Sequence, residues 1–159
     1  MKKIFILLIL SMFYWKNAYA LITVDITRGN LDPLPIAVSP LHVDKKSEKI
    51  KSLETNKLGE EISKIVERNF RSTGLFNPLK KDSFVQKPDI AHLKPRFEDW
   101  RLIKAQALVT GKLLIQDKKL KVEFRLWDLT AGQEMTALAF TTTPSNWRRV
   151  AHIISDKIY

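Results

Sequence analysis

The side chains that could do chemistry in this sequence are three histidines and two pairs of adjacent acids. The histidines are His42, His92 and His152. They lack the short, regular spacing of metal ligands, so we expect no metal site. The acid pairs are Glu60-Glu61 and Glu98-Asp99. Neighbouring side chains on a helix diverge, so we expect these acids to be solvated or to stabilise helix starts, not to act as a general acid and base.

Motifs of catalytic or nucleotide-binding sites are absent from the sequence. It has no cysteine, no Gly-x-Ser-x-Gly motif and no P-loop. We interpret the isolated glycines Gly111 and Gly132 as a point of close packing in a strand and as a hairpin turn. We therefore expect a protein that is not an enzyme and that binds no cofactor.

Tryptophans and lysines are the remaining candidates for ligand binding. The tryptophans Trp100, Trp127 and Trp147 could form a platform for sugar rings, but each lies in an amphipathic segment, which favours core packing. The formal charge is +10, and lysine pairs are scattered beside predicted turns, at Lys45-Lys46, Lys80-Lys81 and Lys118-Lys119. Scattered basic residues are more typical of a solvated surface than of a nucleic-acid site.

The start of the sequence has the pattern of a secretory signal peptide. A basic start precedes the apolar stretch Ile4–Trp15, and Ala18-Tyr19-Ala20 matches an A-x-A cleavage site. The apolar stretch is shorter than the roughly 20 residues that span a bilayer. We predict cleavage after Ala20 and export to the periplasm, without membrane insertion. The lack of cysteine excludes a cysteine-linked lipid anchor and a disulfide framework.

Three segments of alternating apolar and polar residues dominate the second half of the sequence. They span residues 107–116, 119–129 and 133–143, and short polar breaks separate them. This pattern predicts a three-stranded antiparallel meander. Before it, residues 35–41 predict a short strand that lies at an edge or has abrupt ends, because prolines bracket it. A second extended segment is expected at residues 75–79.

Two amphipathic helices are predicted around these strands. The first has one apolar stripe, its start can be capped by Thr55 or Asn56, and Gly74 ends it. The second begins at Thr143-Pro144 and still has no stop signal at Tyr159, which suggests a fragment or a split gene. The two stripes consist of Leu58, Ile62, Ile65, Val66 and Phe70, and of Trp147, Val150, Ala151, Ile154 and Ile158.

These elements predict an α/β protein of the α+β type. Two main amphipathic helices are expected on one face of a mixed, mostly antiparallel sheet of about five strands. A polar excursion over residues 80–94 and a short helix over residues 97–104 lead into the meander. The predicted organisation is a signal peptide at residues 1–20, an exposed segment and linker at residues 21–34, and one domain at residues 35–159.

The segment Leu21–Thr27 is prone to form a strand. Ile22, Val24 and Ile26 alternate with polar residues, and a linker rich in Gly, Asn and Pro follows. Two interpretations remain open from the residues alone. The segment can add to the edge of another protein's sheet, or it can pair as an edge strand within its own domain.

Several long stretches of this sequence, in the same order, resemble the amino-terminal domain of the TolB family, the periplasmic component of the Tol–Pal cell-envelope system. They are Leu21–Ile26, Pro35–Val38, Arg71–Leu79, Asp99–Gly111, Lys121–Leu129 and Trp147–Tyr159. The resemblance covers essentially the whole chain after the predicted signal peptide. It implies a non-catalytic interaction module that acts in envelope integrity, outer-membrane constriction at division and protein import, including colicin uptake.

The resemblance also implies partners. In the family, the exposed amino-terminal segment binds the carboxy-terminal domain of TolA, which corresponds here to Leu21, Ile22, Thr23, Val24, Asp25, Ile26 and Thr27. The family's β-propeller binds the lipoprotein Pal, and this sequence contains no propeller, so Pal is not an expected partner. The alternative is an unrelated periplasmic domain that binds a glycan or another ligand.

Overall fold

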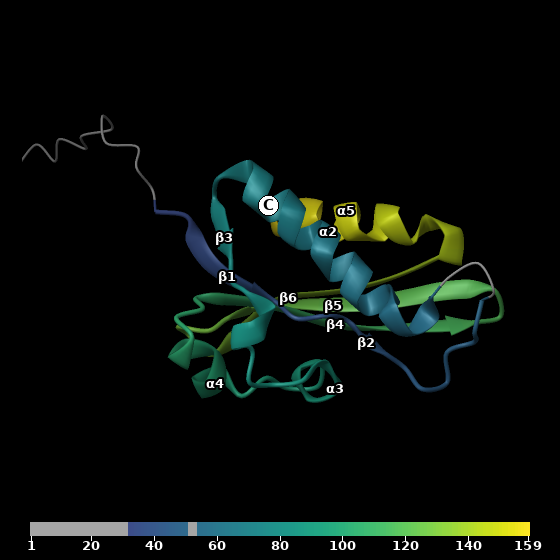
Figure 1. The fold of residues 1–159 in the computed structure, drawn as a ribbon, viewed down its shortest axis with the longest axis horizontal. Helices are drawn as coiled ribbons and strands as arrows, with labels where there is room; N and C mark the ends of the chain where they lie inside the picture. The colour runs from purple at the N-terminus through teal and green to yellow at the C-terminus, as the bar shows by residue number, and fades with distance from the viewer. Residues whose placement is uncertain (1–31, 51–53) are drawn as a thin grey trace, which may run out of the picture. The chain divides into compact units, whose positions relative to one another are not determined.

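The computed structural model describes residues 32–50 and 54–159 (Figure 1). The predicted signal peptide and the segment Leu21–Thr27 lie outside the described residues, as do residues 51–53. The cleavage site, the exposed segment and the boundary at residue 35 therefore remain predictions.

The meander is present where the alternating pattern predicts it. Strands β4 (Ala107–Gln116), β5 (Lys119–Asp128) and β6 (Gln133–Thr142) pair antiparallel in sequence order. Asp117 and Lys118 connect the first two strands, and both have positive φ, 52° and 58°. Two consecutive residues with positive φ are typical of the tight hairpin turn whose twist matches that of the strands. The second turn contains Gly132 at φ 69°, as expected.

The other half of the sheet is parallel and includes a correction to the prediction. Strand β1 (Leu34–Val38) lies between β3 (Phe76–Pro78) and β4, so it is an interior strand and not an edge. Pro35 precedes the first β1 residue paired with β4, and its carbonyl accepts from the Gln106 N–H at 2.9 Å. Its missing N–H therefore removes no hydrogen bond from the β1–β4 ladder. The other possibility that the prolines suggested, a strand with abrupt ends, is confirmed by the short strand Leu34–Val38.

The sheet has the order β3-β1-β4-β5-β6, and the short strand β2 (His42–Val43) pairs with β4 beyond the end of β1. Helices α2 (Leu58–Thr73) and α5 (Trp147–Ile158) cover one face, side by side (Figure 1). The predicted stripes face the sheet and form its main core. A mixed sheet with two main helices confirms the predicted fold class.

The predicted end of α2 is confirmed, the predicted caps at its start are wrong, and the start predicted at Thr143-Pro144 is confirmed in position. Gly74 ends α2 with φ 72°. At the start, Thr55–Lys57 form a 3₁₀ turn without a side-chain cap, and the Thr55 hydroxyl instead accepts from the Ile50 N–H at 3.4 Å. A similar 3₁₀ turn, Pro144–Asn146, precedes α5, with Thr143 at its N-cap position and Pro144 at its start as predicted, but without a side-chain cap hydrogen bond. Tightening the first turn satisfies backbone groups that a side-chain cap would otherwise bind.

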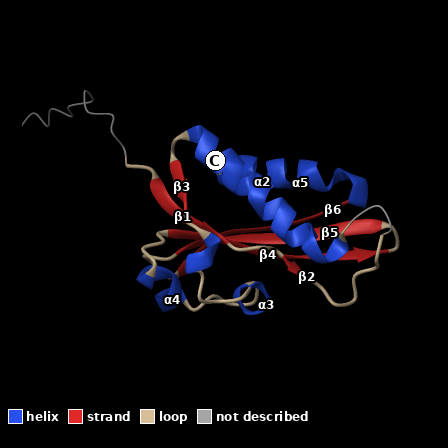
Figure 2. Ribbon diagram, in the orientation of Figure 1, coloured by secondary structure: helices blue, strands red, loops and turns tan. Residues whose placement is uncertain are grey.

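The face opposite these helices is also covered, which the sequence did not predict. The chain between β3 and β4 crosses this face and forms the short helices α3 (Pro88–Ala91) and α4 (Phe97–Leu102) (Figure 2). A second apolar cluster lies beneath it and includes Trp100, Leu108 and Trp127. The first residues of β4 are therefore buried on both faces.

A close approach at Leu41 joins the sheet to α2. The Leu41 N–H donates to the Gly59 carbonyl at 3.2 Å. A Cβ on Gly59 would overlap the Leu41 carbonyl oxygen and lie 2.8 Å from the carbonyl carbon. A Cβ on Gly111 would overlap the Glu123 carbonyl oxygen of β5 and lie 2.7 Å from Leu41 Cδ2, which confirms the predicted close packing there. Gly59 is needed because the Leu41 backbone passes against the helix, and Gly111 is needed chiefly because the backbone of β5 approaches it.

We predict that Gly59→Ala destabilises the protein by at least the ~1–3 kcal/mol typical of an overpacked core, because the atoms that it meets belong to the backbone. Arg68→Ala, on the exposed side of the same helix, is the matched control and should change stability little. Urea unfolding of the two variants measures the difference. Equal unfolding midpoints for Gly59→Ala and Arg68→Ala would contradict the close approach of Leu41 to Gly59.

Candidate functional site

A groove of about 580 Å³ contains many of the titratable side chains that the structure describes. It lies between the segment around β2, the start of α2 and the start of α3. Its lining includes His42, Asp44, Glu60, Lys87 and Asp89. Groups of both charge signs therefore lie around one concavity, although they come from distant parts of the sequence.

Two histidines stack beside this groove. The rings of His42 and His92 are parallel to within 4°, and their centroids are 4.4 Å apart. The His92 Nδ1 lies 2.9 Å from the Pro88 carbonyl, to which its N–H donates, and the His92 carbonyl accepts from Arg125 Nη1 at 3.1 Å. The stack thus connects α3 to β2, and the arginine connects the same segment to β5. Sequence spacing gave no signal for this pair, because the two residues meet only when the excursion folds over the sheet.

The environment of the stack disfavours a proton on His42. Burial lowers the pKa of His42 below its usual 6.5, and His92 acts in the same direction. Asp44 and Asp89 oppose this shift without reversing it. Parallel rings also do not converge on a common point, and no cluster of three potential metal ligands occurs within residues 32–50 and 54–159. The arrangement is a contact between two segments at which burial disfavours a proton on His42.

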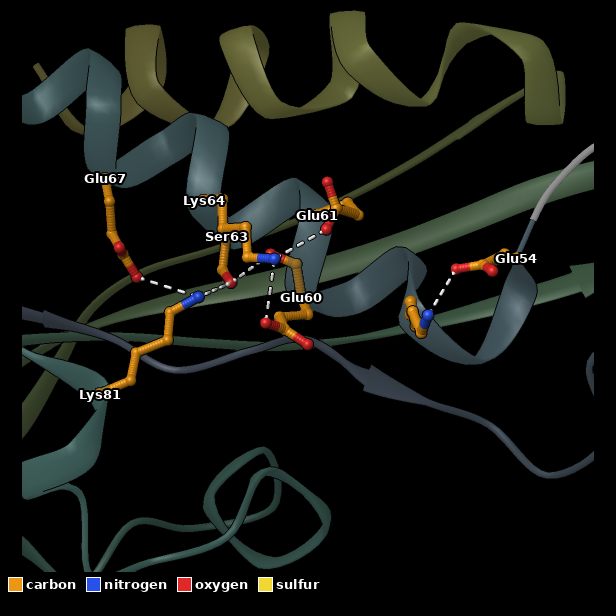
Figure 3. A network of polar contacts seen from close by, with 8 residues as sticks. Glu54, Glu60, Glu61, Ser63, Lys64, Glu67 and Lys81 are labelled. Carbon is orange, nitrogen blue, oxygen red and sulfur yellow. Dashed lines mark hydrogen bonds and ion pairs between the residues drawn. The ribbon is translucent and has the colours of Figure 1, made fainter.

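Lys81 makes a second connection between the excursion and α2 (Figure 3). Its ammonium group donates to the Ser63 hydroxyl at 3.1 Å and lies 3.3 Å from Glu67 Oε1. The side chains of Lys81 and Glu67 are only 25% and 16% exposed. The interpretation of the lysine pairs as solvated surface is therefore wrong for Lys81, whereas its neighbour Lys80 is exposed. The sequence could not show which of these two lysines is packed, because they do not lie in a long helix or strand with a periodic pattern.

Burial dominates the electrostatics of this ion pair. Desolvation raises the pKa of Glu67 above its usual 4.5, and the nearby Lys81 only partly offsets the effect. The adjacent acids Glu60 and Glu61 behave differently, because they are in the first turn of α2 and pair with Lys64 at 3.1 and 2.9 Å. Those two acids take the helix-start position that the sequence predicts.

The tryptophans form no exposed platform. Trp100 is 1% exposed and donates from Nε1 to Gln86 Oε1 at 3.0 Å. Trp127 is 8% exposed and donates to the Thr110 hydroxyl at 2.9 Å. Trp147 is equally buried against the main core. The interpretation of these residues as core packing is confirmed. The described helices include none that is both long enough and apolar enough to cross a membrane.

Comparison with known proteins relates this fold to a family. The model of the TolB amino-terminal domain matches residues 22–135. The chain belongs to the TolB amino-terminal domain family. It is 68% identical over 145 residues to a Tol-Pal system protein TolB of Pelagibacter ubique (strain HTCC1062), which covers 90% of this chain and 32% of that protein. The chain thus spans about a third of the length of that TolB.

Solved structures show the same fold at lower identity. TolB from Acinetobacter baumannii superimposes with a TM-score of 0.62 at 20% identity, over 80% of this chain and 27% of that one. PelC from Paraburkholderia phytofirmans, described as a dodecamer, gives a TM-score of 0.51 at 18% identity, over 78% of this chain and 85% of that one. These identities support the likeness of fold alone.

The TolB match also bears on the predicted partner-binding residues. It begins at Ile22 and so includes all of Leu21–Thr27 except the first residue. The structure does not describe this segment, and the groove with its stacked histidines is formed by described residues alone. The assignment of partner binding to Leu21–Thr27 remains a prediction.

We predict that stability falls as the pH decreases below about 6.5, because the unfolded chain then takes up a proton that folded His42 resists. His42→Phe keeps a ring against His92 without this titration, so its melting temperature should depend less on pH between about 8 and 5.5. Parallel curves for the parent and His42→Phe would contradict the role of His42.

We predict that Lys81→Met lowers the free energy of unfolding at pH 7 by about 1–3 kcal/mol, because it leaves the Glu67 carboxylate half-buried without its cation. The loss should be smaller near pH 4, where Glu67 is protonated readily owing to its raised pKa. Lys80→Met is the control at an exposed neighbour. Denaturant unfolding at both pH values measures the loss of stability. Equal losses for Lys81→Met and Lys80→Met would exclude a stabilising contact between Lys81 and α2.

Proposed function

We propose that this chain is a non-catalytic interaction module of the Tol–Pal system that binds the carboxy-terminal domain of TolA through Leu21–Thr27. The observation that supports the proposal is the 68% identity to a TolB over 90% of the chain, together with a family match that starts at Ile22. The module acts in the periplasm, after removal of the signal peptide at Ala20, and needs no cofactor.

The chemistry of the segment suits strand addition to a partner's sheet. Three branched apolar residues, Ile22, Val24 and Ile26, alternate with polar ones, so one side of an extended segment can pack while the other is solvated. Main-chain hydrogen bonds to an open sheet edge provide affinity, and the alternate side chains select the register. Pairing of this segment with the chain's own domain would be a competing state.

The described domain contributes a firm attachment point for this segment. β1 begins at Leu34 and is bonded on one side to β3 and on the other to β4. The Leu34 N–H donates to the Leu75 carbonyl at 2.8 Å. The six residues between Thr27 and Leu34 can span at most about 25 Å. The proposed partner is therefore tethered to the domain through the start of β1.

In this proposal the module helps to connect the inner membrane to the outer envelope. Its binding to TolA contributes to envelope integrity, to outer-membrane constriction at division and to protein import, including colicin uptake. The competing hypothesis of glycan recognition lacks an exposed aromatic platform, because Trp100, Trp127 and Trp147 are buried.

We predict that deletion of residues 21–27 abolishes binding of the TolA carboxy-terminal domain and leaves the melting temperature unchanged. Isothermal titration of the purified chain with that TolA domain measures the first effect, and thermal unfolding followed by circular dichroism measures the second.

A pair of double variants refines this test. Replacing Ile22 and Val24 by serine should weaken binding, because these side chains lie on the packed side of the extended segment. Replacing Thr23 and Thr27 by serine should leave binding nearly unchanged. Full binding after the deletion would overturn the proposal, and retention on peptidoglycan fragments without TolA binding would favour the glycan hypothesis.

A further inference from the structure

Strand β6 is a long edge strand of the sheet. It ends the strand order, and within the described residues it pairs with β5 alone. It has 10 residues, as many as β4 and β5, so it presents a long row of backbone groups on its outer side. The opposite edge, β3, has only 3 residues and ends at Pro78. Short strands, prolines and bulges are ways in which proteins protect an edge. β6 is neither short nor interrupted by proline, and its one register shift, at Met135, leaves Thr136–Thr142 in regular pairing.

The side chains of β6 do not protect it either. From Met135 to Thr142 there is no charged residue and no proline, whereas neighbouring β5 includes Lys121, Glu123 and Arg125. Charged residues, lysine above all, are the common means of preventing a second strand from pairing with an edge. Glu134 is the only charged residue of β6, and Arg125 of the same chain binds it at 3.1 Å.

Apolar side chains are exposed along the same strand. Met135 is 60% exposed and Leu138 is 40% exposed, and the small residues Ala137 and Ala139 are exposed as well. Leu138 lies opposite Phe124, which is in the main core, and so projects to the face that carries the helices. Ala137 and Ala139 lie opposite Arg125 and Glu123 and project to the other face.

We propose that β6 is a self-association site, at which β6 of one copy pairs antiparallel with β6 of a second copy about a two-fold axis perpendicular to the sheet. Such an axis keeps the helices of both copies on one face of a continuous sheet. Directly opposed residues must then project to the same face. Every register centred on a β6 residue satisfies this condition. In the regular part of the strand, Thr136–Thr142, the two registers near the middle place Leu138 opposite Leu138 or Ala139 opposite Ala139.

The lack of charge along Met135–Thr142 argues for a second copy as the occupant. The formal charge of the chain is +10, so two copies repel each other over most of their surfaces. In the register centred on Leu138, Ala137 meets Ala139 and Thr136 meets Phe140, with no like charges opposed. The strand is thus complementary to itself, which is the requirement for a two-fold interface. Because salt screens the remaining repulsion, self-association should strengthen as salt increases.

Disulfide trapping tests this geometry directly, because the chain contains no cysteine. Leu138→Cys and Ala139→Cys each place two thiols at the proposed axis in one of the two registers, and opposed Cβ atoms there are close enough for a disulfide. At least one variant should form a dimer under mild oxidation. Leu102→Cys, at an 80% exposed position in α4 away from the edge, is the control.

Sedimentation equilibrium of the cysteine-free chain provides an independent measurement. The purified chain should show a monomer–dimer equilibrium that strengthens with salt. Ala139→Lys should abolish it, while the new lysine can pair with Glu123 on the adjacent strand and preserve the melting temperature. A monomer at all concentrations, or trapping no greater than with Leu102→Cys, would overturn the proposal. A dimer that Ala139→Lys leaves intact would exclude β6 as its site.

Discussion

The burial of strand β4 is the constraint on which the rest of this fold depends. β4 is bonded to β1 and β2 on one side and to β5 on the other, so the parallel and antiparallel halves of the sheet meet at it. Val109, Leu113 and Ile115 face the helices, while Leu108 packs beneath the excursion on the opposite face. A strand that is apolar on both faces requires cover on both. α2 and α5 supply one layer, and the chain between β3 and β4 supplies the other.

Polar contacts then determine where the second layer lies. The stacked His42 and His92 connect it to β2, Arg125 connects it to β5, and Lys81 connects it to α2. Each contact involves a partly desolvated charged group or imidazole. Such groups need a partner at a definite distance and orientation, so these contacts fix the position of the second layer more narrowly than hydrophobic burial alone. The pKa directions at His42 and Glu67 reflect the same cause, because burial disfavours the charged form of both groups.

The edges of the sheet connect this scaffold to possible partners. β1 is interior and anchors the start of the described domain, next to the short and proline-ended β3. β6, at the far edge, is long and uncharged over most of its length. Strand pairing is the common physical principle of both proposals, because unpaired backbone groups at an edge gain hydrogen bonds when another strand is added. The proposed interaction with TolA uses a segment before β1, and the proposed self-association uses β6.

The sequence by itself determined the elements whose signal is periodic. Alternation over residues 107–143 predicted the three strands of the meander, and the stripes containing Val66 and Ile154 predicted α2 and α5. Gly74 and Gly132 were predicted as the end of a helix and a turn, because positive φ favours glycine. The family could also be inferred, since long matches in order carry far more information than a short motif.

Only the tertiary structure decided how the irregular segments pack. The interior position of β1, the histidine stack, the burial of Lys81 and the cover over the second face all depend on contacts between residues distant in the sequence. Periodicity describes which side of one element is apolar, but it does not specify the neighbouring element or the register. For that reason the alternating pattern predicted β6 as a strand, and only the strand order made it the open edge.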